Sequence, residues 1–142
     1  MNKPNNKKIT VDVVVKASTD IVWKRWTTPE DIVQWNHASA DWHTPRAKND
    51  LRDGGEFLYR MEAKDGSFGF DFGGIYNQVK FQKYIKYTLG DGRKVEIHFA
   101  STGSSSKVTE TFEAEEQNPI EIQRAGWQAI LNNFKQYAES KL

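Results

Sequence analysis

Four short clusters of turn-forming residues divide the middle of the sequence into segments in which apolar and polar side chains alternate. The clusters are Asp53-Gly54-Gly55, Asp65-Gly66, Asp91-Gly92 and Gly103-Ser104-Ser105. Asp-Gly between two alternating segments is a strong signal of a β-hairpin. Connections this short cannot form the crossover that parallel strands require. The chain is therefore restricted to a fold built around an antiparallel meander.

Alternating apolar side chains predict about seven strands in total. The expected strands span residues 9–15, a short segment near 47–51, and 56–63, 68–79, 84–89, 95–99 and 108–114. In "GSFGFDFGG" three phenylalanines share one parity, and the pair of glycines that follows them suggests a β-bulge, which would swap the facing of the side chains. The sequence leaves open which of four side chains face inward: Phe68, Phe70, Phe72 and Asp71.

Two short helices and one long helix are predicted outside the meander. Ser18 is expected to cap the first short helix. Thr28 is expected to cap the second, with Pro29 in its first position and Asp31 closing a capping box. Asn118 is expected to cap the C-terminal helix, which carries apolar side chains at helical spacing. These side chains are Trp127, Ile130, Leu131, Phe134 and Ala138.

Gly126 lies inside the long helix, where glycine costs about 1 kcal/mol relative to alanine. We expect close packing under Trp26 or Trp35 to explain it. The alternative is a weak point that lets the helix open.

Composition excludes several classes of protein. The 142 residues suggest one domain, with residues 1–7 as a flexible tail and 8–142 as the folded part. A formal net charge of +1 without a basic run gives no reason to expect nucleic acid as a partner. The sequence lacks cysteine, a signal peptide and an apolar segment of membrane-spanning length. These features predict a cytoplasmic protein without a membrane span, and no motif indicates a cofactor.

The order of strand, two short helices, antiparallel meander and long helix is that of a helix-grip fold. The motifs in this order are "TTPEDIVQW", "DLRDGGEFLYRM", "GGIYNQV", "KVTETF" and "GWQAILNNFKQY". In these motifs the sequence resembles the activator of heat-shock protein 90 ATPase homologue family, within the START-like (SRPBCC, birch-pollen-allergen-like) superfamily, over residues 8–140. It departs from the family at "VKFQKY", which lacks the usual proline-containing turn. The resemblance implies an α+β fold in which an antiparallel sheet wraps around the C-terminal helix.

The resemblance also implies an apolar cavity between the sheet and that helix. Aromatic walls would suit a flat or apolar ligand. The alternative is that the rings fill the space completely, as in ordinary close packing. The expected ligand-binding residues are Trp35, Phe57, Tyr59, Met61, Phe70, Tyr76, Tyr87, Glu110, Phe112, Trp127 and Leu131.

Glu110 shares the parity of Val108 and Phe112, which predicts an inward carboxyl group. An unpaired buried carboxylate is costly, so we expect it to be paired, protonated or in contact with a ligand. A solvated position near an open end of the sheet is the alternative. Arg60 and His98 are candidate partners, although each would need a bulge to turn inward.

The types of side chain at His37, Asp41 and His43 could bind a metal, but these residues lie in one predicted loop over residues 36–48 without regular spacing. We therefore expect no metal site. The loop is expected to border the mouth of the cavity, with Trp35 and Trp42 packed beneath it.

Three functions follow from the resemblance. The preferred one is non-catalytic binding of a small hydrophobic or aromatic molecule. The second is a chaperone ATPase regulator that acts by protein contact, although the activator proper has an additional N-terminal domain for which this chain leaves no room. The third is a polyketide cyclase- or aromatase-like enzyme in which Glu110 supplies the acid–base group. Stress-response proteins also occur in the superfamily. We expect a binding protein rather than an enzyme.

Overall fold

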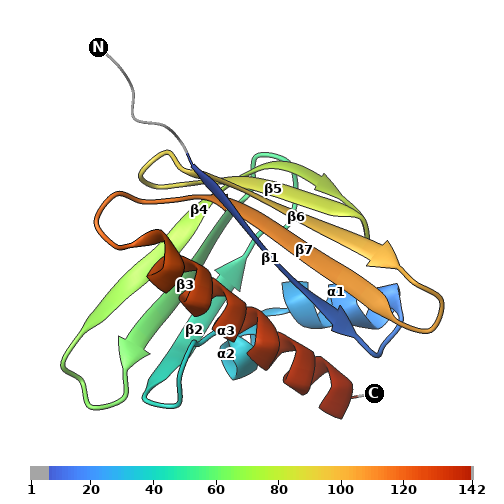
Figure 1. Ribbon diagram of the computed structural model, residues 1–142, viewed down its shortest axis with the longest axis horizontal. Coiled ribbons are helices and arrows are strands. Elements are labelled where there is room, and N and C mark those ends of the chain that lie inside the picture. The colour runs from blue at the N-terminus through green and yellow to red at the C-terminus, as the bar shows by residue number, and fades with distance from the viewer. Residues whose placement is uncertain (1–6, 142) are drawn as a thin grey trace.

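In residues 7–141, which the computed structural model describes, a seven-stranded antiparallel sheet curls around a long helix (Figure 1). The strand order along the sheet is β1-β7-β6-β5-β4-β3-β2. The strands are β1 (Lys8–Val15), β2 (Trp42–Asn49), β3 (Glu56–Ala63), β4 (Gly69–Lys80), β5 (Tyr84–Leu89), β6 (Lys94–Ser101) and β7 (Ser106–Glu113). The helices are α1 (Thr19–Thr27), α2 (Pro29–Trp35) and α3 (Ile120–Ser140). This arrangement confirms the predicted α+β helix-grip fold. The predicted flexible tail lies almost entirely outside the described residues.

Helix α3 lies along the edge strand β1 (Figure 1). Arg124, Gln128 and Lys135 donate hydrogen bonds to the backbone carbonyls of residues 10, 12 and 14, at 3.2, 3.0 and 2.8 Å. These bonds cover a row of edge-strand acceptors that would otherwise face solvent. Among residues 7–141, none of the helices combines the length and apolar composition that a membrane span needs.

A cluster of aromatic rings fixes the C-terminal half of α3 to the two short helices. Phe134 is fully buried, and its ring meets those of Trp26 and Trp35 edge to face, with centroids 4.8 and 4.9 Å apart. Trp26 and Trp35 themselves lie 4.8 Å apart. The C-terminal half of α3 is therefore anchored to α1 and α2, whereas in its N-terminal half Trp127 stacks on Phe112 of β7.

The predicted loop over residues 36–48 is wrong in its second half, because β2 already begins at Trp42. The strand pairs with β3, and its register shifts between His43 and Arg46. Pro45 lies inside this shift, which is where an edge strand tolerates a residue without an N–H group. Because proline is unusual inside a strand, the sequence around Pro45 does not indicate one.

The predicted bulge at Gly73 and Gly74 is also wrong. Both glycines continue the ladder with β3, opposite Leu58 and Phe57, and the register instead shifts between Tyr76 and Gln78. The glycines serve a different purpose: a Cβ atom at position 74 would collide with the backbone carbonyl of residue 88 on the neighbouring strand.

Helix capping differs from the prediction at all three helices. Ser18 stands at the N-cap of α1, but its side chain donates to Asp20 instead of accepting from the helix backbone.

Thr28 precedes α2 and Pro29 occupies its first position, as expected, but Asp31 does not close a capping box. The Asp31 carboxylate is buried, and it accepts hydrogen bonds from Tyr137 at 2.5 Å and Arg25 at 3.3 Å. This tertiary contact replaces the local cap.

Helix α3 begins one residue later than predicted, with Pro119 rather than Asn118 at its N-cap. Asn118 instead donates to the side chain of Glu115. Gln123 bonds back to the backbone of this turn. The expectation of close packing around Gly126 is wrong as well, because a Cβ atom there would meet open space.

Candidate functional site

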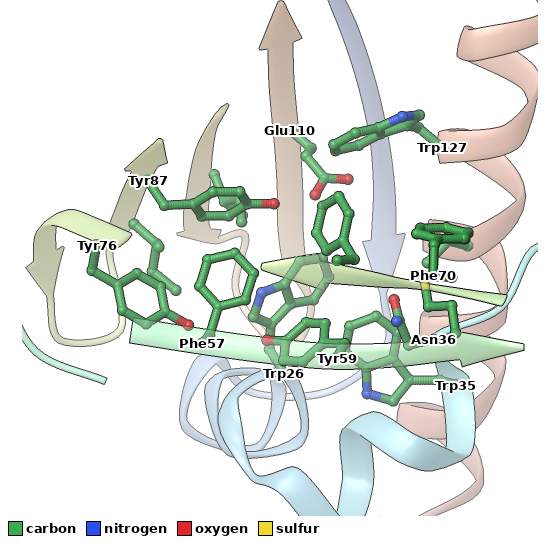
Figure 2. Close-up of a pocket in the computed structure, with 15 residues that line it drawn as sticks. Trp26, Trp35, Asn36, Phe57, Tyr59, Phe70, Tyr76, Tyr87, Glu110 and Trp127 are labelled. Carbon is green, nitrogen blue, oxygen red and sulfur yellow. The ribbon is translucent and has the colours of Figure 1, made fainter. Parts of the chain in front are cut away.

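A cavity of about 170 Å³ lies between the inner face of the sheet and the three helices (Figure 2). Nine of its fifteen lining residues in the described part of the chain are aromatic, and its wall is mainly apolar. The lining residues are Trp26, Trp35, Asn36, Phe57, Tyr59, Met61, Phe70, Phe72, Tyr76, Ile85, Tyr87, Ile97, Glu110, Trp127 and Ile130. The space is large enough for a small ring system, because an engineered apolar cavity of about 150 Å³ binds benzene.

The inward faces of β3, β4 and β5 build the aromatic wall. Phe57 pairs with Gly74 across the β3–β4 ladder, and Tyr76 pairs with Tyr87 across the β4–β5 ladder. The Phe57 ring lies 5.2 Å from that of Tyr76 and 4.7 Å from that of Tyr87. These three rings therefore meet on one face of the sheet.

The structure places nine of the eleven residues predicted for the ligand site around this cavity. They are Trp35, Phe57, Tyr59, Met61, Phe70, Tyr76, Tyr87, Glu110 and Trp127. Phe112 and Leu131 do not line it, which corrects the prediction. The Phe112 ring is covered by that of Trp127, stacked on it at 3.9 Å with 10° between the planes, and Leu131 is fully buried in the core.

Six lining residues were not among those predicted: Trp26, Asn36, Phe72, Ile85, Ile97 and Ile130. Ile85 has the parity of Tyr87 on β5, so strand periodicity could have identified it. Trp26 and Asn36 enter from the helical segment, where no signal in the sequence shows which face meets the sheet.

Strand β4 also settles the facing of its alternating residues. Phe70 and Phe72 reach the cavity, and Phe70, 40% exposed, lies at its rim. Phe68 does not reach the cavity; its ring packs 6.0 Å from that of Trp42 and is 62% exposed. Asp71 faces outward, 3.5 Å from Arg60. The entrance therefore lies beside β4.

Glu110 is the one acidic residue in the lining, and its side chain is aimed into the cavity (Figure 2). It sits on β7 opposite Val11 of β1 and Ile97 of β6, so its neighbours in the sheet are apolar. The residue is 6% exposed, which excludes the solvated alternative. Burial raises the pKa of Glu110 to about 8. The carboxyl group is therefore largely protonated at neutral pH.

Neither proposed partner reaches Glu110. Arg60 pairs with Glu62 at 2.9 Å on the outer face, and His98 is exposed beside Glu96 at 3.8 Å. Among residues 7–141, no basic side chain forms an ion pair with Glu110 and no group donates a hydrogen bond to its carboxyl oxygens. Within these residues, the carboxyl oxygens of Glu110 are therefore unpaired, and they face the cavity.

Three phenol groups accompany Glu110. Figure 2 shows the Tyr87 hydroxyl and the Glu110 carboxyl group pointing toward one another. Burial raises the pKa values of Tyr59 and Tyr87 well above the ordinary range, and the Glu110 charge contributes to both shifts. Tyr76 donates a hydrogen bond to Asn49 at 2.5 Å, which ties β4 to β2. All three phenols therefore stay neutral near pH 7.

His37, Asp41 and His43 do not converge on a site. His43 lies 3.8 Å from Glu62, and Asp41 accepts a hydrogen bond from Ser39. Burial lowers the pKa of His37, with smaller effects of Lys64 and His43. Within the described part of the chain, no three potential metal ligands lie together.

In the described part of the chain, the lining of the cavity offers one acidic group for proton transfer, Glu110. An acid near its apparent pKa can exchange a proton, but catalysis of most reactions also needs a second positioned group. Apart from the neutral phenols, Glu110 is the only titratable side chain among the lining residues of the described part of the chain. A mainly apolar wall with few polar groups is typical of sites that bind small molecules.

Comparisons with known proteins agree with this architecture. Residues 16–139 match the family described as "Activator of Hsp90 ATPase homolog 1-like protein". The solution structure of an AHSA1-like protein from Aeromonas hydrophila is 42% identical, with a TM-score of 0.89 over 95% of this chain and 94% of that one. A solution structure from Cytophaga hutchinsonii is 54% identical, with a TM-score of 0.82 over 94% and 93% of the two chains. No curated protein matches the chain.

Proposed function

The chain belongs to the family of Activator of Hsp90 ATPase homolog 1-like proteins, and we propose that it binds one small aromatic molecule non-covalently between its sheet and α3. The observation that carries this proposal is the cavity itself, which is bordered by nine aromatic rings and contains one unpaired carboxyl group. Protein interiors normally pack to full density, so a space of this size beside a solvent-exposed rim favours an occupant.

The volume of the cavity limits the size of the molecule that it could bind. About 170 Å³ suits one ring or two fused rings with a short substituent, and it is too small for a long acyl chain. Ring faces and edges around the space favour stacked and edge-to-face contacts with a flat molecule. The polar atoms of Glu110 and the nearby phenols would orient it.

A pair of matched variants tests this function. Ile97 lines the cavity and is 1% exposed, whereas Ile75 lies on the outer face of the sheet and is 49% exposed. Ile97→Phe should fill part of the cavity and weaken binding of indole at least about tenfold, while Ile75→Phe should leave the affinity unchanged. Isothermal titration calorimetry measures both, with thermal unfolding as the check that each variant is folded.

Wild-type protein is expected to bind indole with a dissociation constant between about 1 μM and 1 mM, given the small number of atoms in the ligand. Absence of measurable binding to the wild type, or equal binding by the two variants, would contradict the proposed function.

A further inference from the structure

The cavity wall can become negatively charged, at Glu110, but it contains no positively charged side chain among residues 7–141. Among the lining residues that the structure describes, Glu110 alone can carry a formal charge near neutral pH, since the three phenols stay neutral. Within the part of the chain that the structure describes, no lysine, arginine or histidine lines the space. An anionic ligand would therefore meet no compensating charge, and it would be repelled once Glu110 is ionised.

Several hydrogen-bond donors of the wall are already engaged. Tyr76 donates to Asn49, the Asn36 amide donates to Thr44 at 3.2 Å, and the Trp35 indole donates to the carbonyl of Arg25 at 3.0 Å. The remaining donors are indole and phenol groups and, while it is protonated, the Glu110 carboxyl group, all of which are neutral. The carboxyl oxygens of Glu110 are thus the strongest unpaired acceptors that face the cavity.

Aromatic rings surround this acceptor. Trp127 is stacked on Phe112 and lies beside Glu110, while Tyr87 approaches it from β5 (Figure 2). A ring of aromatic side chains with a carboxylate is the arrangement that recognises organic cations, because ring faces attract positive charge when water is excluded. The same rings also accommodate an apolar ring of the ligand.

We propose that the ligand is a small aromatic amine, bound as an ammonium ion that pairs with the Glu110 carboxylate. This inference rests on the proposed function of the cavity and specifies its ligand class. Binding places the ammonium N–H groups on the Glu110 oxygens and the ring of the amine among the aromatic side chains. The proton that Glu110 loses in forming the ion pair passes to solvent, so charge and protons balance.

The titratable groups that face Glu110 are the phenols of Tyr59 on β3 and Tyr87 on β5. Its neighbours on β1, β6 and α3 are Val11, Ile97 and Trp127, none of which titrates. Because the pKa of Glu110 in the free protein is about 8, an ammonium ion competes with a proton below that pH. Its affinity should rise by more than about tenfold from pH 6 to pH 8.

Phenethylamine, 2-phenylethanol and phenylacetate provide the test, since they have similar shapes and carry a positive, a neutral and a negative group. At pH 8, calorimetry should show phenethylamine binding at least about tenfold more tightly than 2-phenylethanol, and phenylacetate binding most weakly. Only phenethylamine should release protons below pH 8, which titrations in two buffers of different ionisation enthalpy detect without any variant.

Glu110→Gln should abolish the preference for phenethylamine, so that this variant binds phenethylamine and 2-phenylethanol with about equal affinity. Glu96→Gln, the same change on the outer face of β6, should retain the preference. Binding of 2-phenylethanol without a preference for the amine, or an affinity for the amine that falls as the pH rises to 8, would overturn the ligand class and leave the proposed function standing. Failure of all three compounds to bind would overturn both.

Discussion

Phe134→Ala is expected to lower the free energy of unfolding by about 3–5 kcal/mol. The Phe134 ring is fully buried and meets both Trp26 and Trp35 edge to face, so truncation removes apolar burial and two aromatic contacts at once. The loss should be at the upper part of this range, because three helices meet at the ring and their anchored backbones cannot easily collapse into the space.

Chemical denaturation monitored by tryptophan fluorescence measures this loss. Phe68→Ala is the matched control, because the Phe68 ring is 62% exposed and its aromatic neighbours are Trp42 and Phe70. We expect the control to lose about 1 kcal/mol or less. Equal losses in the two variants would contradict the role of Phe134 as the anchor of α3.

The second large effect is a dependence of stability on pH that belongs to Glu110. Its pKa is raised from an ordinary value of 4.5 to about 8 by burial, so the folded protein holds a proton that the unfolded chain releases. The stabilising contribution is fully present below about pH 4.5 and is lost as the pH rises toward 8. A shift of this size corresponds to a loss on the order of 4 kcal/mol.

The unfolding free energy of Glu110→Gln relative to wild type measures this contribution, because glutamine does not titrate. Between pH 5 and pH 9 the variant should gain on the order of 4 kcal/mol relative to wild type. Groups with lowered pKa values, such as Glu62 and Glu139, are present in both proteins and cancel in the difference. Glu96→Gln should show no such change. A constant difference between wild type and Glu110→Gln across this range would contradict the buried, unpaired carboxyl group.

Strand periodicity predicted more of this protein than local helix signals did. The period of two residues assigned Phe57, Met61, Tyr87 and Glu110 to the inner face, because neighbouring positions on a strand point to opposite sides. Parity does not show which part of that face a helix covers. Phe112 was therefore predicted to line the cavity although Trp127 stacks directly on it.

Capping motifs were less reliable, since their partners can be replaced by residues distant in sequence. Asp31 has the position of a capping-box acid, but it bonds to Tyr137, which lies on α3. No short-range pattern contains that contact. The first half of strand β2 was not predicted, because Pro45 is unusual inside a strand. The glycines at 73 and 74 were interpreted as a bulge, whereas they allow neighbouring strands to lie close together.

The fold alone does not specify the ligand. A crystal structure from Nitrosomonas europaea has a TM-score of 0.81 over 94% of this chain and 95% of that one at only 18% sequence identity. The same fold can therefore be built by chains that differ at most of their positions. Glu110 and the surrounding rings are the features of this chain from which a ligand class can be argued.

The most direct test of the binding cavity is a titration of the protein with 2-phenylethanol, followed by amide chemical shifts in NMR spectra. We expect the largest changes near Phe57, Tyr87, Glu110 and Trp127, which lie on four different elements and meet only at the cavity. Saturable changes confined to these positions are the predicted result. Changes centred on the exposed rings of Phe68 and Phe81, or no changes at all, would contradict the existence of a usable cavity between the sheet and α3.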